Sequence, residues 1–251
     1  MIRHQPIADG ELADVRGRLQ TRPRDLVAWA LARFAPERRV VVTGLQVEGV
    51  AVASMALELD PTVRLLTIDT GRLPRATHRY LAELRAHWDR DIEVVHPDPR
   101  QLDTFTRHHG VDAFYRSPQL RLDCCHIRKV APLERALADV DCWMTGLRRE
   151  QSAGRATTPA IELDDRHGRI VKVNPIAGWT DVQVRAYVEE RGVPVHPLYA
   201  QSYRSIGCDP CTRPVAANED RRAGRWWWEQ GSEKECGIHA APLRVVPAGR
   251  S

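Results

Sequence analysis

The chain has 251 residues, of which 43% are hydrophobic and 28% are charged, and this composition excludes a disordered protein and a disulfide-stapled miniprotein. The formal net charge is +4 with both signs spread along the chain, so we expect a small anionic ligand and no nucleic acid. The longest apolar stretch, residues 40–52, is interrupted by Thr43, Gln46 and Glu48 and is too short to span a membrane. The N-terminus has no apolar signal sequence, so a cytoplasmic protein without membrane contact is expected.

Short apolar runs alternate with helical patterns in the first part of the chain. The predicted strands cover residues 39–43, 63–68, 92–95 and 142–145, and the predicted helices cover residues 48–59, 76–88 and 128–138. This alternation predicts an α/β fold with a mostly parallel sheet and flanking helices. Residues 160–163 and 169–173 are predicted to follow as a hairpin, with a polar turn between them.

The composition changes after one more predicted helix, at residues 180–190. Thr180 is the expected N-cap of this helix, and Gly192 and Pro194 end it. From residue 193 onward the chain is rich in proline, glycine and cysteine and has no clear periodicity. We therefore predict an α/β domain over residues 1–192, followed by a cysteine-bearing lobe and mobile tail over residues 193–251.

The cysteines are arranged in a way that indicates metal chemistry. Cys208 and Cys211 form a C-x-x-C pair, and Cys124 and Cys125 are adjacent, so two pairs can surround one metal centre. Structural zinc ligands are usually separated by a few residues, whereas adjacent cysteines can bind different irons of one cluster. The pattern thus favours a 4Fe-4S cluster over zinc. A thioredoxin-like redox pair is the alternative for the C-x-x-C motif, but that motif normally lies near a βαβ unit.

The two remaining cysteines receive different predictions. Cys142 precedes Trp143 in a predicted buried strand and is expected to be a small core residue. Cys236 lies near the C-terminus, where a lone thiol has little packing role, and Gly237 permits close backbone approach. His239, with Arg222 and Arg225, can stabilise its thiolate, so Cys236 is a candidate nucleophile. An incidental exposed thiol is the alternative.

Four motifs occur in an order that resembles one family. They are residues 124–133 (CCHIRKVAPL), 145–149 (TGLRR), 206–212 (IGCDPCT) and 235–239 (ECGIH). Together they resemble the assimilatory adenylyl-sulfate (APS) reductases of the phosphoadenylyl-sulfate reductase family, iron-sulfur type. The resemblance extends from the strand at residue 40 to His239 and implies an adenine-nucleotide α-hydrolase-like sheet domain. It also implies one 4Fe-4S cluster held by four ligands, which are Cys124, Cys125, Cys208 and Cys211.

The resemblance implies a reaction as well. In the family, cluster cysteines accompany APS as substrate, whereas enzymes that use the 3′-phosphorylated form (PAPS) commonly lack them. Cys236 is implied as the catalytic thiolate, which would attack the sulfate sulfur, release AMP and form an S-sulfocysteine. Thioredoxin or a similar dithiol would then release sulfite. Self-association into a homo-oligomer is compatible with the sequence, which does not define an oligomeric state.

Substrate contacts are predicted around the carboxyl edge of the sheet, where open α/β sheets bind ligands. Arg148 and Arg149 follow a predicted strand and are expected to hold phosphate and sulfate oxygens. Lys129 is one of only three lysines among 37 basic residues, and on a helix it would share a face with Cys125, between cluster and substrate. The full predicted substrate-binding set is Lys129, Arg148, Arg149, Arg222, Arg225, His239, Thr43, Asp69 and Gly71.

Two departures from the family pattern and two alternative functions accompany this prediction. Residues 43–49 read TGLQVEG where the family often has small residues and an acidic pair, and Ile238 replaces the more usual leucine.

An ATP-pyrophosphatase-type enzyme, such as a tRNA sulfur-transfer enzyme, would need an SGGxDS-type loop that residues 43–49 lack. A four-cysteine zinc module could bind single-stranded nucleic acid through aromatic and basic residues, here Trp226, Trp227, Trp228, Arg221, Arg222 and Arg225.

Overall fold

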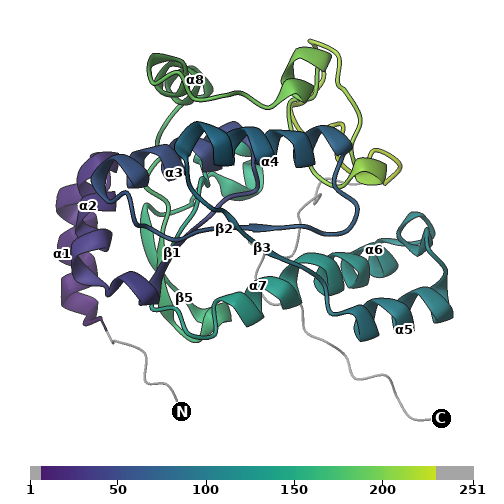
Figure 1. Cartoon of the computed structure of the whole chain (residues 1–251), viewed down its shortest axis with the longest axis horizontal. Coiled ribbons are helices and arrows are strands. Elements are labelled where there is room, and N and C mark those ends of the chain that lie inside the picture. Colours follow the sequence, from purple (N-terminus) through teal and green to yellow (C-terminus); the bar gives the residue numbers. More distant parts are fainter. Residues whose placement is uncertain (1–6, 230–251) are drawn as a thin grey trace.

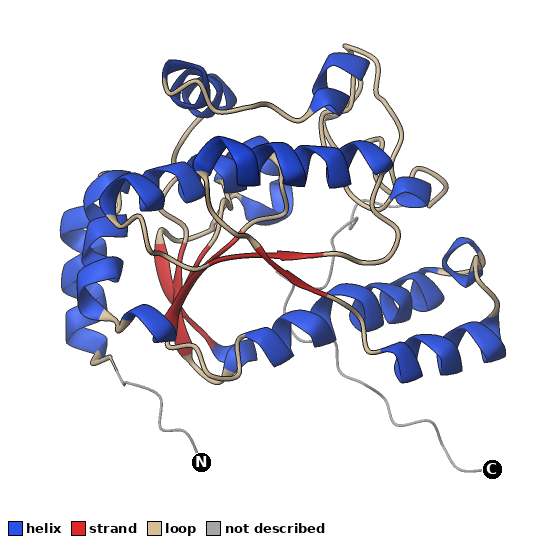
Figure 2. Cartoon of the chain, viewed as in Figure 1, coloured by secondary structure: helices blue, strands red, loops and turns tan. Residues whose placement is uncertain are grey.

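The computed structural model describes residues 7–229, and these fold around a central six-stranded sheet. The strand order is β3-β2-β1-β4-β6-β5, and every neighbouring pair is parallel except the antiparallel pair of β5 and β6. The strands are β1 (Arg39–Val42), β2 (Leu65–Ile68), β3 (Glu93–Val95), β4 (Cys142–Met144), β5 (Ile161–Asp164) and β6 (Ile170–Val173). Figure 2 shows the sheet with helices on both sides. The predicted mostly parallel α/β fold and its hairpin are confirmed.

The helices are only partly those predicted from the periodicity. The observed helices are α1 (Asp9–Leu19), α2 (Pro23–Arg33), α3 (Val47–Leu59), α4 (Arg75–Trp88), α5 (Pro99–His109), α6 (Pro118–Cys125), α7 (Ala131–Ala136) and α8 (Asp181–Glu190). The predicted helices at residues 48–59, 76–88 and 180–190 are confirmed as α3, α4 and α8, and Thr180 caps α8 by accepting from the Gln183 backbone N–H. The sequence analysis did not predict α1, α2, α5 or α6.

The predicted helix at residues 128–138 is wrong in its bounds. Helix α6 begins earlier, where the Ser117 hydroxyl accepts from the Leu120 backbone N–H, and a π-helical turn at His126–Val130 connects it to α7. The widened turn ends just before Pro132, whose ring would clash with the Arg128 carbonyl in a regular α-helix. The turn follows Cys125 directly, so it determines how the adjacent cysteines are presented.

Alternate residues of the central strands pack on opposite faces of the sheet. Val41, Leu65, Met144 and Val171 belong to the core that includes α2, α3 and α4, whereas the preceding or following residue in each strand packs on the α7 side. This period-2 alternation, with both faces covered, is the arrangement expected of a buried parallel sheet. Figure 1 shows α3 and α4 on one side of the sheet and α7 on the other. Within residues 7–229 no helix is long and apolar enough to cross a membrane.

The segment after α8 returns to the sheet domain and packs on α4 (Figure 1). Its anchor is His196, which is 1% exposed and lies edge-on to Tyr80. The His196 Nε2 atom is 2.9 Å from the Thr77 hydroxyl, and its Nδ1 atom accepts from the Leu198 backbone N–H. The predicted boundary at residues 192 and 193 remains a prediction, and the predicted tail beyond Glu229 lies outside the described residues.

The buried His196 gives a prediction for stability against pH. Burial lowers the pKa of His196 to about 4 from an ordinary value of 6.5, so between these values the unfolded chain binds more protons. Stability is therefore expected to fall as the pH drops from about 6.5 toward 4, by up to about 3 kcal/mol. Urea denaturation at pH 7 and pH 5 measures this loss. The loss should shrink in His196→Gln, and an equal loss in both proteins would contradict the assignment.

Candidate active site

A cavity of about 200 Å³ lies at the carboxyl ends of β1, β2 and β4. Its lining includes Val42 at the end of β1, Thr43 after it, Thr67 and Ile68 of β2, and Thr145 after β4. The chain continues from β1 to one side of the sheet and from β4 to the other, so the cavity lies at the point where the strand order reverses. This is where open α/β sheets bind their ligands.

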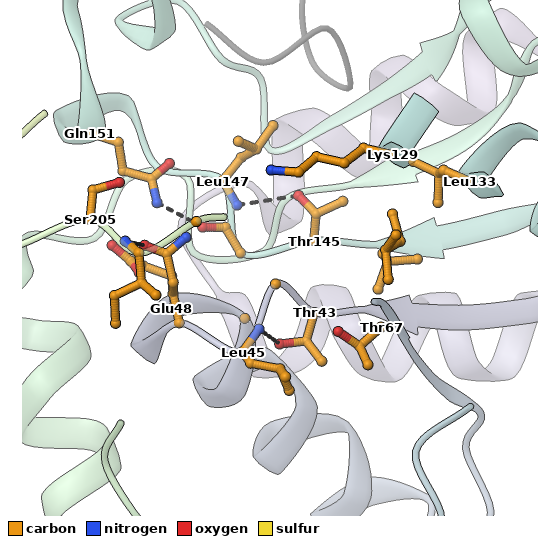
Figure 3. Close-up of a pocket in the computed structure, with 18 of the residues that line it drawn as sticks. Thr43, Leu45, Glu48, Thr67, Lys129, Leu133, Thr145, Leu147, Gln151 and Ser205 are labelled. Atoms are coloured by element: carbon orange, nitrogen blue, oxygen red, sulfur yellow. Dashed lines mark hydrogen bonds between the residues drawn. The ribbon is translucent and has the colours of Figure 1, made fainter. Parts of the chain in front are cut away.

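The loop between β1 and α3 forms one wall of the cavity. The Thr43 hydroxyl accepts from the Leu45 backbone N–H at 3.0 Å, and Leu45 itself has a left-handed backbone with φ of 55° (Figure 3). A Cβ atom at Gly146 would lie 2.5 Å from the backbone of Glu48, so only glycine lets the loop after β4 pass this close to α3. The two loops thus meet across the floor of the cavity.

The start of α3 is bonded to the segment after α8. Gln46 is the N-cap of α3 and does not cap it with its side chain. Instead, its Oε1 atom accepts from the Ile206 backbone N–H at 2.9 Å, and the Val47 backbone N–H donates to the Tyr199 hydroxyl at 3.1 Å. These bonds join the start of α3 to residues 199–206, and Ser205, Ile206 and Gly207 of this segment line the cavity.

Five basic side chains line the cavity. They are Lys129, Arg155, Arg221, Arg222 and Arg225. Figure 3 shows Lys129 extended along the cavity on the side opposite Thr43 and Leu45. Four predicted contact residues therefore share this cavity: Thr43, Lys129, Arg222 and Arg225. Sequence reasoning missed Arg155, which donates to Gln151 at 2.6 Å, because a lone arginine in a loop carries no spacing signal.

Arg225 is a buried cation without a carboxylate partner among the described residues. It is 5% exposed, and its Nη1 atom has only long contacts, 3.3 Å to the Ser205 hydroxyl and 3.4 Å to the Ile206 carbonyl. Its guanidinium lies 4.7 Å from the centre of the Trp226 ring, and its buried Nε atom has no partner within residues 7–229. A buried, uncompensated charge is costly, so this arginine indicates an anionic ligand.

Arg148 and Arg149 lie elsewhere than the sequence analysis expected. Arg148 is fully buried and is not part of the cavity lining; its guanidinium pairs with Glu48 at 3.1 Å, Glu150 at 2.8 Å and Asp181 at 3.2 Å. Three carboxylates saturate its charge, so it is an internal anchor in this structure. Arg149 donates to the Thr158 carbonyl and also lies outside the lining.

Of the other residues predicted for the site, Asp69 and Gly71 lie next to the cavity, and two lie beyond Glu229. Asp69 accepts from the Gly71 backbone N–H at 2.8 Å and pairs with His78, and neither Asp69 nor Gly71 belongs to the lining, although Thr70 does. Cys236 and His239 lie outside the described residues.

The four cysteines of the two pairs line a second, smaller cavity. Cys124, Cys125, Cys208 and Cys211 are each 7% or 8% exposed, and none forms a disulfide. The Cys208 Sγ atom is 3.3 Å from the Thr70 hydroxyl. The other lining residues are Arg72, Phe114, Arg121, Arg128 and Lys129. Lys129 lines both cavities, so it lies between the four thiols and the larger cavity.

The arrangement of the four thiols can be compared with what a single metal ion and a cluster each require. Within residues 7–229 no three His, Cys, Asp or Glu side chains are grouped to hold a metal ion. A cluster spreads its thiolates over several irons, so it needs a wider arrangement than the tetrahedron around one zinc ion. Four buried thiols facing one cavity with basic walls fit that requirement. Burial raises the pKa of the Cys211 thiol to about 12, so a ligand that binds thiolates has to overcome this cost.

Trp226 is packed in the interior, whereas Trp227 is exposed. Trp226 is 1% exposed and lies between the guanidinium groups of Arg121, at 4.5 Å, and Arg225. It belongs with the cysteines to one buried cluster, and its backbone N–H donates to the Cys211 carbonyl. Trp227 is 49% exposed. Trp226 is therefore unavailable for stacking on a nucleic-acid base.

Cys142 is fully buried in β4. Burial raises the pKa of its thiol far above the ordinary value, so the thiol stays neutral. This agrees with the predicted core role of Cys142.

Comparisons with known proteins agree with this geometry. Residues 38–214 match the phosphoadenosine phosphosulfate reductase domain. The chain is 45% identical to an adenosine 5′-phosphosulfate reductase of Burkholderia cepacia and 42% identical to one of Allochromatium vinosum. The first alignment covers 82% of each chain, and the second covers 80% of this chain and 78% of the relative.

Solved structures show the same fold. A phosphoadenylyl-sulfate reductase of Candida auris aligns with a TM-score of 0.71 at 24% identity, over 85% of this chain and 100% of that one. An FMN adenylyltransferase of Candida glabrata in complex with ATP aligns with a TM-score of 0.54 at 12% identity, over 86% of this chain and 71% of that one. These likenesses confirm the predicted mostly parallel α/β fold with flanking helices. The domain match and the two relatives identify the chain as a member of the phosphoadenosine phosphosulfate reductase family.

Proposed function

We propose that the chain is an assimilatory adenylyl-sulfate reductase, which converts adenosine 5′-phosphosulfate to sulfite and AMP with electrons from thioredoxin or a similar dithiol. The observation that carries the proposal is Arg225, a buried cation without a carboxylate partner in the described chain, in a cavity at the sheet's switch point. The names of the closely related proteins support the same substrate.

The adenine and the phosphosulfate of the substrate match the apolar and the basic parts of the cavity lining, respectively. Apolar side chains at the ends of β1 and β2 and in the loop after β2 suit an adenine ring; they are Val42, Ile68 and Leu73. Lys129, Arg155, Arg222 and Arg225 suit the phosphate and sulfate oxygens, because guanidinium groups bind such oxyanions with two parallel hydrogen bonds. In this proposal Arg148 is not a substrate ligand.

Cys236 is the proposed nucleophile. Its thiolate attacks the sulfate sulfur, forming an S–S bond while the S–O bond to AMP breaks and AMP leaves with the electron pair. The cations around the phosphosulfate offset the negative charge that develops on the leaving oxygen. A thiolate of the dithiol then attacks the Cys236 sulfur and expels sulfite, and its second thiol restores Cys236, so the dithiol supplies both electrons. His239 is proposed to stabilise the Cys236 thiolate.

Cys124, Cys125, Cys208 and Cys211 are proposed to hold one 4Fe-4S cluster. When bound, the cluster would supply negative charge close to the substrate site, with no electron transfer needed in this scheme. Lys129 lines both cavities, so its ammonium group is suited to couple the charge of the thiolates to that of the substrate. This role is positioning and electrostatic.

Turnover and metal content of anaerobically purified protein test the proposal together. With a dithiol reductant, sulfite release is expected from APS and not from PAPS, and iron and acid-labile sulfide are expected in equal amounts, about four of each per chain. Preference for PAPS would overturn the assigned substrate. Zinc without sulfide would overturn the cluster and return the four cysteines to a structural zinc site.

A further inference from the structure

Glu48 is the one carboxylate among the described residues that line the larger cavity. It lies in the first turn of α3, and its side chain is 4% exposed. A free carboxylate here would repel the anion for which the basic residues are suited. Its presence in the lining therefore needs an explanation beyond ligand binding.

Glu48 is held in a network of ion pairs, in which Asp181 also pairs with Arg185 at 2.7 Å. Its Oε1 atom accepts from Arg221 Nη2 at 2.8 Å and from Arg148 Nη2 at 3.1 Å. Asp181, at the start of α8, accepts from the same two arginines, through Arg221 Nη1 and Arg148 Nη2. Glu150 also pairs with Arg148. The network joins α3, the loop after β4, α8 and the segment near residue 221, which are far apart in the sequence.

Arg221 and Arg225 both line the larger cavity, but only one of the two has its charge neutralised by carboxylates. Burial lowers the pKa of Arg221, but the opposite charges of Glu48 and Asp181 outweigh this and raise it, so Arg221 stays protonated. Both of its terminal nitrogens are directed to carboxylates. Arg225 has no such partner in the described chain. Arg221 is thus bound as an anchor, whereas Arg225 keeps an uncompensated charge.

The anchor is adjacent to the residues that face the ligand. Arg221 directly precedes Arg222, and the chain turns tightly there, since the Arg222 N–H donates to Asp220 and the Arg225 N–H donates to the Arg222 carbonyl at 2.8 Å. A displacement of Arg221 would therefore move Arg222 and Arg225 together. The Glu48 and Asp181 pairs restrain this turn from α3 and α8.

We infer that Glu48 and Asp181 are positioning residues, which orient Arg222 and Arg225 toward the phosphosulfate by holding Arg221. The inference rests on the proposed function. Long-range electrostatics alone would predict the opposite result, since removing the negative charge of Glu48 from an anion-binding site should tighten binding of the anion. Glu48→Gln keeps the size of the side chain and removes its charge. It is expected to raise the KM for APS and the Kd for AMP about tenfold, with a smaller effect on kcat.

Calorimetric titration with AMP, together with initial rates with APS, measures these effects. Asp181→Asn is the second variant, because Asp181 does not line the cavity and cannot touch the ligand. It is expected to weaken binding in the same direction. In a protein that already carries Arg221→Gln, Glu48→Gln is expected to cause no further loss of affinity for AMP, because the ion pair between Glu48 and Arg221 is already absent.

The matched control is Glu219→Gln, which removes an ion pair with Arg213 at 2.7 Å in the same segment, away from the cavity. Its KM and Kd are expected to equal those of the wild type. If Glu48→Gln or Asp181→Asn binds AMP as the control does, or more tightly, the inference is overturned. If the wild type neither binds AMP nor reduces APS, the proposed function fails instead. Thermal unfolding of each variant separates loss of folding from loss of affinity.

Discussion

Replacement of Cys236 with serine is expected to abolish sulfite release from APS and the enzyme-bound sulfonate adduct. A serine hydroxyl remains protonated near neutral pH and is a far weaker nucleophile than a thiolate, so the first S–S bond cannot form. Intact-protein mass spectrometry after anaerobic incubation with APS measures the adduct directly. In the wild type a single adduct is expected, and thioredoxin should remove it.

Cys142→Ala is the matched control for this variant. Cys142 is fully buried in β4 and has no role in the proposed chemistry, so its variant should form the adduct as the wild type does. An adduct that persists in Cys236→Ser would show that another thiol reacts. A wild-type protein that contains its cluster and forms no adduct would remove Cys236 as the nucleophile.

Arg225→Gln is expected to lower kcat/KM for APS by roughly 10² to 10³-fold. The substitution removes a buried positive charge that no carboxylate of the described chain neutralises, so the charge is available to the substrate. Loss of one donor that stabilises a developing oxyanion costs about 2.7–4 kcal/mol, which corresponds to this factor. Steady-state rates with APS measure the change. Arg225→Lys restores the charge without the fork of a guanidinium, so partial recovery is expected.

Arg213→Gln provides the comparison for Arg225→Gln. Arg213 lies in the same segment, and Glu219 neutralises it near the surface, so its removal should leave kcat/KM within a factor of about three. Equal activity of Arg225→Gln and Arg213→Gln would mean that the anion binds elsewhere. Circular dichroism of both variants checks that the fold is retained.

The strands were predictable because their sequence signal is local. Strands β1, β2 and β6 are short runs rich in valine, leucine and isoleucine, and β4 is the apolar run Cys-Trp-Met. Burial on both faces of the sheet requires little else of the sequence. Helices α1, α2 and α5 were missed, although α5 has a local N-cap in Asp98, which accepts from the backbone N–H groups of Arg100 and Gln101. Helices α1 and α5 have few apolar residues, so tertiary packing defines them more than periodicity does. Helix α2 does carry apolar residues at helical spacing, Leu26, Val27, Ala30 and Leu31, and the sequence analysis did not use this signal.

The arginines show where sequence reasoning ended. Arg148 and Arg149 follow a strand and therefore had the position expected of anion ligands. Arg148 is instead neutralised by the neighbouring Glu150 and by Glu48 and Asp181, which lie 100 and 33 residues away in the sequence. Which arginine keeps a free charge depends on such distant carboxylates, and no local pattern reports them.

The sequence by itself determined the α/β class, the strand positions and the two cysteine pairs, because hydrophobic periodicity and ligand spacing are local properties. Only the tertiary structure decided that the two cysteine pairs face one cavity, that Lys129 borders both cavities, and that Arg225 is uncompensated among the described residues. The physical reason is that burial and charge compensation depend on groups from four separate segments, which meet only when the sheet and the segment after α8 pack together.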